Sequence, residues 1–335
     1  MRKPRKQPAT PVTSRQIAQR LGVSQSTVSR VLSGAAGYTY SDETRSRILA
    51  EAERLNYRPN AVGRSLRERR TRVVGFCSRH GNLDAHNMFL AEIIGDLQRA
   101  CAAKGQFLLL LNFDPRLPVP TVHAELMSGR IDGLVLHADD RDPLVDLLAG
   151  STLPVVAVAD RIRSMPSALC DDQDGMAQAV AHLVERGHRR IAFLNPPDGL
   201  ASVRDRAAAY ESEMKRRGLQ PICVPVAYED AEPALDVMLS RADPVTAVCC
   251  WNDVTALVLL GACRRAGIRV PDDLAIVGFD GLIDDRIASQ RLTTVVAHWP
   301  EVTAAALAAL GALLAGKEVP AETVVPVTLR TGETT

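Results

Sequence analysis

The sequence predicts an α/β protein in which an all-helical N-terminal head precedes a body built on parallel sheets. Short capped helices fill the head, and from Arg72 onward short β-branched runs alternate with helical stretches. Strands and helices that alternate along a chain form parallel sheets covered by helices. Charge divides at the same point, because the first 72 residues carry 16 Lys and Arg against 5 Asp and Glu, and the rest carry 24 against 34. We therefore expect a basic head and an acidic body.

Length and composition indicate a soluble globular protein of two or three structural units, with 335 residues, 46% hydrophobic and 24% charged. No apolar run follows the basic start at Met1, and no segment reaches the roughly 20 apolar residues of a membrane helix. We expect a cytoplasmic protein without membrane association. The seven cysteines include no Cys-x-x-Cys pair, which argues against a disulfide framework and a zinc site. No metal or cofactor is expected.

The head carries the start and stop signals of three short helices. A Thr-x-x-Gln capping box at Thr13 begins the first helix, and Gly22 ends it. Ser24 caps a second helix, and a third follows the cap at Ser41 and runs to about Leu55. Two short helices joined by a tight glycine turn, the second of them polar at its start, predict a helix-turn-helix.

The charge of the head indicates its partner. A basic head on an acidic body indicates that the head binds a polyanion and that the body does not. A solvated basic tail is the alternative reading of charge alone. The helix-turn-helix pattern favours double-stranded DNA as the partner.

The order and spacing of short segments in the head and hinge allow a comparison with known families. These segments are Val12-Thr, Ile17-Ala, Leu21-Gly-Val-Ser, Thr27-Val-Ser-Arg-Val-Leu32, Tyr57-Arg-Pro-Asn60 and Arg64-Ser-Leu66. With them the chain resembles the LacI/GalR family of bacterial transcriptional regulators. The resemblance implies a homodimer that binds a pseudo-palindromic DNA operator under the control of a small-molecule effector. Repression is the usual mode of the family, and activation is the alternative.

The start of the second helix is the expected reading element. Gln25 and Ser26 stand where side chains reach base edges in the major groove, and Arg30 suits guanine or a phosphate. The alternative is that Gln25 and Ser26 are simply solvent-exposed residues at the start of a helix. Phosphate contacts from neighbouring hydroxyls would position the head without reading sequence. The expected DNA-binding residues are Thr13, Ser14, Ser24, Gln25, Ser26, Thr27, Ser29, Arg30, Tyr57, Asn60, Arg64 and Leu66.

Residues 59–71 are expected to link the head (1–58) to the body (72–330). Asn60 can cap a short hinge helix, and the resemblance implies that Leu66 wedges into the minor groove at the centre of the operator. A small core contact within the hinge is the alternative role of Leu66. Gly63 should weaken this helix in isolation by up to about 1 kcal/mol, which makes its folding depend more on DNA.

The body has eight expected strands, separated by helices such as 89–104, 175–186 and 254–266. These strands are Val73–Cys77, Phe107–Asn112, Gly133–His137, Val155–Ala159, Arg190–Asn195, Ile222–Val226, Ala247–Trp251 and Ala275–Phe279. The resemblance implies the periplasmic-binding-protein fold, with two lobes joined by three crossovers. Lobe one is expected at about 72–170 and 297–323. Lobe two is expected at about 171–296 and 324–330, and it includes a closing strand at Val324–Leu329.

Polar side chains follow three of these strands and should line the space between the lobes. Asp160, Asn252 and Asp280 suit sugar hydroxyls or an amine, because ligands bind at the carboxyl ends of parallel strands. Arg204 matches the arginine that holds the effector in the family, and a surface ion pair with Asp205 or another neighbour is its alternative. Phe89 and Trp299 are expected to offer aromatic faces to a ligand ring, and packing in the core is the alternative for each. A sugar or sugar derivative is the expected effector.

Other functions have less support in the sequence. The chain contains no Gly-x-Ser-x-Gly, His-Glu-x-x-His or Gly-x-Gly-x-x-Gly motif, so an enzyme is not expected. A regulator controlled by a protein corepressor is the first alternative, and a solute-binding protein without DNA regulation is the second. The chain departs from the family at Val296-Ala-His298, where an Arg is usual, so the identity of the effector is not carried over. We expect His298 to be a packed or surface residue rather than a switch.

Overall fold

A computed structural model describes residues 12–33, 39–58, 63, 65, 68, 70–81, 87–196, 199–226, 231–282 and 290–335. The chain forms two compact units, Met1–Thr71 and Arg72–Thr335, and each is considered by itself. Asn60, Arg64 and Leu66, expected at the operator, lie outside the described residues. Among the helices described, none is long and apolar enough to cross a membrane.

Within residues 12–33 and 39–58, the head consists of three helices around a core of their own. Helix α1 spans Ser14–Leu21, α2 spans Gln25–Ser33 and α3 spans Asp42–Arg54. Ile17, Val28 and Ile48, one from each helix, are fully buried against each other. The predicted capping box at Thr13 is present, and Gly22 ends α1 with a φ of 66°, a left-handed conformation that glycine adopts without strain.

Lobe one of the body contains a six-stranded parallel sheet. Its strand order is β11-β5-β4-β3-β1-β2. The strands are β1 Val73–Ser78, β2 Phe107–Leu110, β3 Gly133–His137, β4 Val155–Val158, β5 Ser167–Cys170 and β11 Glu322–Val325. All neighbouring pairs are parallel, which confirms the predicted α/β class with parallel sheets.

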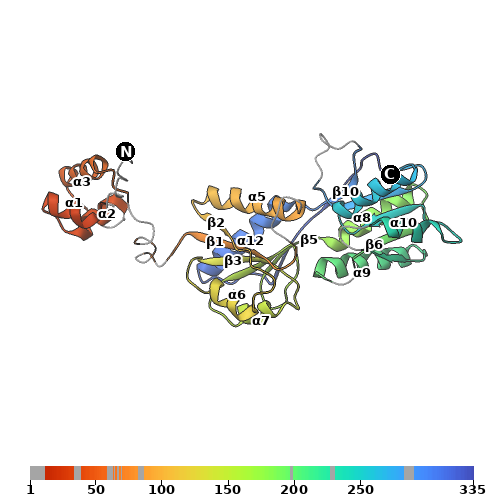
Figure 1. Cartoon of the computed structure of the whole chain (residues 1–335), viewed down its shortest axis with the longest axis horizontal. Helices are drawn as coiled ribbons and strands as arrows, with labels where there is room; N and C mark the ends of the chain where they lie inside the picture. The colour runs from red at the N-terminus through yellow and green to blue at the C-terminus, as the bar shows by residue number, and fades with distance from the viewer. Residues whose placement is uncertain are drawn as a thin grey trace, which may run out of the picture. The chain divides into compact units, whose positions relative to one another are not determined.

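Helices cover both faces of this sheet (Figure 1). Phe76 and Val135 point toward the face covered by α5 (Met88–Ala103) and α12 (Trp299–Leu314). Leu134 and Leu136 point toward the face covered by α6 (Val119–Leu126) and α7 (Pro143–Ala149). Because side chains alternate along a strand, a strand covered on both faces is buried along its whole length and is largely apolar. The run Gly133-Leu-Val-Leu-His137 is buried throughout for this reason.

Lobe two repeats the arrangement with the order β12-β10-β9-β8-β6-β7. Helices α8 and α9 cover one face, and α10 and α11 cover the other. The strands are β6 Ile191–Asn195, β7 Ile222–Pro225, β8 Ala247–Cys250, β9 Ala275–Asp280, β10 Thr293–Val296 and β12 Thr328–Arg330. The helices are α8 Asp172–Glu185, α9 Ala201–Arg216, α10 Glu232–Leu239 and α11 Asp253–Ala266. Strand β12 alone runs antiparallel to its neighbour, β10.

The chain crosses between the lobes three times, after β5, after β10 and after β11. The third crossing corrects a prediction, because the single strand expected at Val324–Leu329 in lobe two is two strands. Strand β11 belongs to lobe one and β12 to lobe two. Pro326 lies between them and has no N–H for a sheet ladder, so the strand ends there and the chain changes sheets.

Candidate functional site

The N-terminal end of α2 presents an exposed polar surface on the head. Gln25 and Ser26 are exposed, while Val28 and Val31, further along the helix, are buried. Ser24 caps the helix by accepting the Thr27 backbone N–H at 3.0 Å. The cap satisfies a free N–H of the first turn, and the exposed side chains of that turn remain accessible to a ligand.

The starts of α1 and α2 are held side by side. The Gln25 amide donates to the Ser14 hydroxyl at 3.1 Å. Thr27, Ser29 and Arg30 follow Gln25 along α2 and are partly buried. Tyr57 packs against the head core, which gives it a structural role beside the expected one.

In the body, Asp160 joins the two lobes. It follows β4 of lobe one and is 2% exposed. Its Oδ1 accepts the backbone N–H of Ser202, in the first turn of α9 of lobe two, at 2.9 Å. Its Oδ2 lies 3.2 Å from Nε2 of His137, whose Nδ1 lies 3.0 Å from the Ser78 hydroxyl. Burial opposes ionisation, but the interactions with His137 and the hydrogen bonds from Ser202 together outweigh it and lower the pKa of Asp160.

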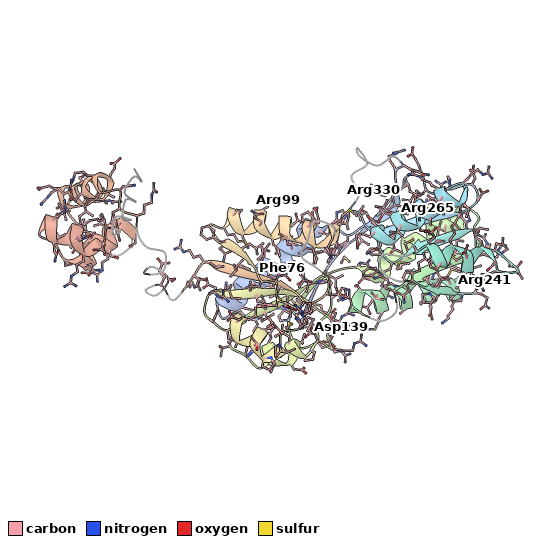
Figure 2. All side chains as sticks on the ribbon, viewed as in Figure 1. Phe76, Arg99, Asp139, Arg241, Arg265 and Arg330 are labelled. Carbon is pink, nitrogen blue, oxygen red and sulfur yellow. The ribbon has the colours of Figure 1, made fainter. Side chains whose placement is uncertain are left out.

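Two ion pairs also connect lobe one with α9. Arg161 donates to Asp205 at 2.6 Å, and Arg204 lies 3.4 Å from Asp139. Figure 2 labels Asp139 on the side of lobe one that faces α9. The Arg204 side chain is 42% exposed and also donates to the Gly199 carbonyl. The structure thus gives Arg204 a surface ion pair, although with Asp139 rather than Asp205.

The arginine at the centre of the buried polar cluster is Arg206, which was not among the predicted site residues. Its side chain is 3% exposed and donates to Asp172 at 2.7 Å, to the Trp251 carbonyl at 2.7 Å and to Asp280 at 3.2 Å. Its guanidinium carbon lies 3.6 Å from the centre of the Phe279 ring, a cation–π contact. This set joins the start of α8, the ends of β8 and β9, and α9.

Helical periodicity could have distinguished Arg206 from Arg204. Residues two apart in a helix point to nearly opposite sides, so only one of the two arginines can face the core. Val203 and Tyr210 lie three residues before and four after Arg206 and are buried. The apolar face of α9 therefore includes position 206 and excludes 204.

Carboxylates outnumber cations in this buried cluster. Burial raises the pKa of Asp280 to about 8, because the charge of Arg206 compensates only in part and Asp253 and Asp172 repel it. Burial also raises the pKa of Asp253 to about 6, against hydrogen bonds from Thr294 and the Leu282 N–H. Asp280 has a φ of 111°, a conformation that favours glycine, and such strain is common at functional sites.

The remaining predicted residues lie near these groups or in the core. Asn252 is 9% exposed and caps α11 by accepting the Thr255 N–H at 2.8 Å. Phe89 contacts Trp299, with ring centres 5.0 Å apart, and His137, with ring centres 5.3 Å apart. Trp299 is 4% exposed and belongs to the hydrophobic core.

A cavity of about 680 Å³ lies between the lobes beside this cluster. Arg161 of lobe one and Ser202, Asp205 and Ser212 of α9 line it. Asp172 lines it as well and links it to Arg206. None of the six residues predicted to bind the effector is part of its lining. The cavity therefore adjoins the buried cluster from the α9 side.

Two family models match the chain: "Bacterial regulatory proteins, lacI family" over residues 13–60 and "Periplasmic binding protein-like domain" over residues 180–335. The HTH-type transcriptional repressor PurR of Photobacterium profundum is 30% identical over 299 residues, 86% of this chain and 87% of that protein. The lac repressor dimer bound to operator and the anti-inducer ONPF is 27% identical, with a TM-score of 0.85 over 97% of this chain and 99% of that one. A complex of the transcriptional regulator CelR with cellobiose is 25% identical, with a TM-score of 0.71 over 97% and 100%.

Proposed function

The chain belongs to the lacI family of bacterial regulatory proteins and is a DNA-binding transcriptional repressor, and from that premise we propose how it binds DNA and what controls it. Two copies bind a pseudo-palindromic operator in the cytoplasm, each placing α2 in the major groove. A small polar effector, a sugar or sugar derivative, binds between the lobes and changes the affinity for the operator. The observation that carries this proposal is the exposed, capped start of α2 on a basic head, joined to a body with buried carboxylates between its lobes.

Sequence reading is assigned to Gln25, Ser26 and Arg30, and Gln25 is suited to adenine because its amide offers a donor and an acceptor. Phosphate contacts are assigned to Ser14, Thr27 and Ser29, and Tyr57 is proposed to support the head from its core. The proposed contacts of Thr13 and Ser24 use backbone N–H groups, because both hydroxyls already cap helices. The roles of Asn60, Arg64 and Leu66 in the hinge remain predictions from the sequence.

Footprinting and a gel-shift assay test this assignment. The double variant Gln25→Ala/Ser26→Ala should lose base preference at two or more operator positions while keeping its melting temperature. Ser33→Ala, at the other end of α2, is the matched control and should bind as the parent does. An unchanged base preference in the double variant would remove these residues from the reading surface. Binding should also weaken steeply with salt, because phosphate contacts release counterions.

The effector site is assigned to the polar side chains between the lobes. Asp160, Asn252 and Asp280 lie at strand ends there, Arg206 replaces Arg204 as the central arginine, and Phe89 and Trp299 supply an apolar border. Thermal-shift screening of a metabolite library, followed by operator titration with each hit, tests the site. Asn252→Ala should weaken a hit at least tenfold, and Asn195→Ala gives a second variant at a neighbouring strand end. A hit that binds both variants unchanged would place the effector elsewhere.

A second copy of the chain is proposed to pack on the β2 edge of lobe one. Phe107 is 69% exposed and Leu110 is 45% exposed on this edge strand. Exposed apolar edge strands are commonly covered by another chain, and a relative of this chain was solved as a dimer. Phe107→Asp should shift sedimentation from dimer to monomer, whereas Leu147→Asp on α7 should not. A dimer that persists in Phe107→Asp would exclude this face.

A further inference from the structure

Three neighbouring strands of lobe two end in polar side chains with open hydrogen-bonding groups. Strands β6, β8 and β9 are adjacent in the sheet, and Asn195, Asn252 and Asp280 stand at their carboxyl ends. The Asn195 Oδ1 is buried and accepts no hydrogen bond from the described residues. Asn252 uses its Oδ1 to cap α11, and its amide nitrogen donates to no described residue. This row presents an acceptor, a donor and a carboxylate at successive strand ends.

Asp280 is the residue of this row whose carboxylate is only partly hydrogen-bonded. One of its oxygens accepts from Arg206 at 3.2 Å, and the other receives no hydrogen bond within the described part of the chain. Arg206 lies closer to Asp172, at 2.7 Å, so its single charge is shared between two carboxylates. Asp253, on α11, adds a third buried carboxylate beside them. Arg330 on β12 acts on Asp253, so two cations serve three carboxylates among the described residues, and an ionised Asp280 has no cation of its own there.

We propose that the effector carries a protonated amine that pairs with the free oxygen of Asp280, together with hydroxyl groups that meet Asn252 and Asn195. This inference rests on the proposed effector site and narrows its ligand to an amine-bearing polyol, such as an amino sugar. The amine supplies the missing positive charge through a charge-assisted hydrogen bond. The Asn252 amide donates to a ligand oxygen, and Asn195 accepts from a ligand hydroxyl.

Anionic effectors fit this row poorly. Of the cationic side chains described here, the one buried beside Asp280 is Arg206, and its donors already serve Asp172, Asp280 and the Trp251 carbonyl. A phosphate or carboxylate placed beside Asp280 would add negative charge to a buried cluster in which carboxylates already outnumber cations. Sugar phosphates and sugar acids should therefore bind weakly.

The test compares matched probes on the full-length protein. Glucosamine, galactosamine and mannosamine are paired with glucose, galactose and mannose, and with their 6-phosphates, inside a metabolite library screened by thermal shift and calorimetry. We expect hits to carry an amine and to lose at least tenfold in affinity when a hydroxyl replaces it. Hits that are anionic, or hydroxyl analogues that bind as tightly as the amines, would overturn the amine assignment and leave the effector site intact. A library without any hit would overturn both.

Asp280→Asn supplies the second readout. Asparagine keeps an acceptor for Arg206 and removes the charge, so the amine should lose its advantage over the hydroxyl analogue. Asp236→Asn, exposed on α10 of the same lobe, is the matched control and should keep the preference of the parent. Unchanged preference in Asp280→Asn would contradict the proposal.

Proton release in the parent protein gives a measurement that requires no variant. Among the described residues, the charged and titratable groups near Asp280 are Arg206 on α9, Asp172 on α8, Cys170 on β5 and Asp253 on α11, and Asp253 also meets Arg330 on β12. Burial in this setting raises the pKa of Asp280 to about 8. An amine that pairs with Asp280 at pH 7 should displace roughly one proton per site, measured by calorimetry in buffers of different ionisation enthalpy. A bound amine that releases no proton would contradict the pairing.

Discussion

The Asp160 carboxylate in lobe one caps the helix of lobe two that contains Ser202. Helix α9 begins after its N-cap residue Leu200, whose side chain makes no capping hydrogen bond. The Asp160 Oδ1 accepts the Ser202 N–H at 2.9 Å and so fills the position of an N-cap from the opposite lobe. Negative charge is favourable at this end of a helix. Contact between the lobes and capping of α9 are therefore one interaction.

Replacing Asp160 with Ala should destabilise the body strongly. The substitution leaves His137 without its buried carboxylate partner and the α9 terminus without its cap. Removing one member of a buried pair costs about 3–5 kcal/mol. Urea denaturation of the body signal measures the loss in free energy of unfolding. Asp146→Ala, exposed on α7, is the control, and a similar loss in both variants would show that the lobe-to-lobe contact contributes little.

Arg206 and Arg204, two residues apart on α9, should differ sharply in a matched pair of variants. Arg206→Ala leaves Asp172 and Asp280 buried without a cation, and we expect a loss of about 3–5 kcal/mol or failure to fold. Arg204→Ala removes a partly exposed pair with Asp139, which is worth about 1 kcal/mol or less. Thermal melting of both proteins decides the order. Equal melting temperatures would contradict the central position of Arg206.

The raised pKa of Asp280 predicts a pH dependence of stability. Its pKa is about 8 in the folded protein against an ordinary value of 3.8, so the folded state binds more protons between these values. Stability from this group is complete below about pH 4 and is lost as pH rises through 8, by up to ~1.4 kcal/mol per pH unit. Relative to Asp280→Asn, the parent should lose stability between pH 5.5 and 8.5 in urea titrations. Parallel curves for the two proteins would refute a raised pKa.

Two helical glycines should respond in opposite ways to alanine. A methyl group at Gly175 on α8 would lie 2.7 Å from the Phe279 ring and 3.0 Å from Val295, so Gly175→Ala should cost about 1–3 kcal/mol. At Gly311 on α12 no atom lies within 4 Å of the added carbon. Gly311→Ala should gain up to about 1 kcal/mol from helix propensity. Chemical denaturation distinguishes the two, and a stabilised Gly175→Ala would contradict the close packing of α8 on β9.

Much of the fold follows from local signals in the sequence. The caps at Thr13, Ser24 and Ser41 mark helix starts, because short polar side chains satisfy the free N–H groups there. Eight strands of the body are apolar enough to be found by pattern. Strand β5, Ser167–Cys170, has the short mixed sequence Ser-Ala-Leu-Cys and depends on its neighbours β4 and β11 for its structure. Such tertiary dependence leaves little local signal.

The candidate site was partly predictable. The rule that ligands meet the carboxyl ends of parallel strands selected Asp160, Asn252 and Asp280, and the structure places all three at such ends. The same rule applies to Asn195, which was not among the predicted residues. Arg206 was not predicted, because the family motif was placed on Arg204 without asking which of the two arginines lies on the buried face of the helix.

Because the chain crosses between the lobes three times, each lobe is built from segments that are far apart in the sequence. Neither lobe is a contiguous stretch of chain, because β11 returns to complete the sheet of β1–β5 and β12 returns to complete the sheet of β6–β10. A protease cut in any one crossing would leave the two lobes joined covalently by the two remaining connections. Deletion of everything after residue 290 would strip strands from both sheets at once, so the two lobes should be gained or lost together rather than separately.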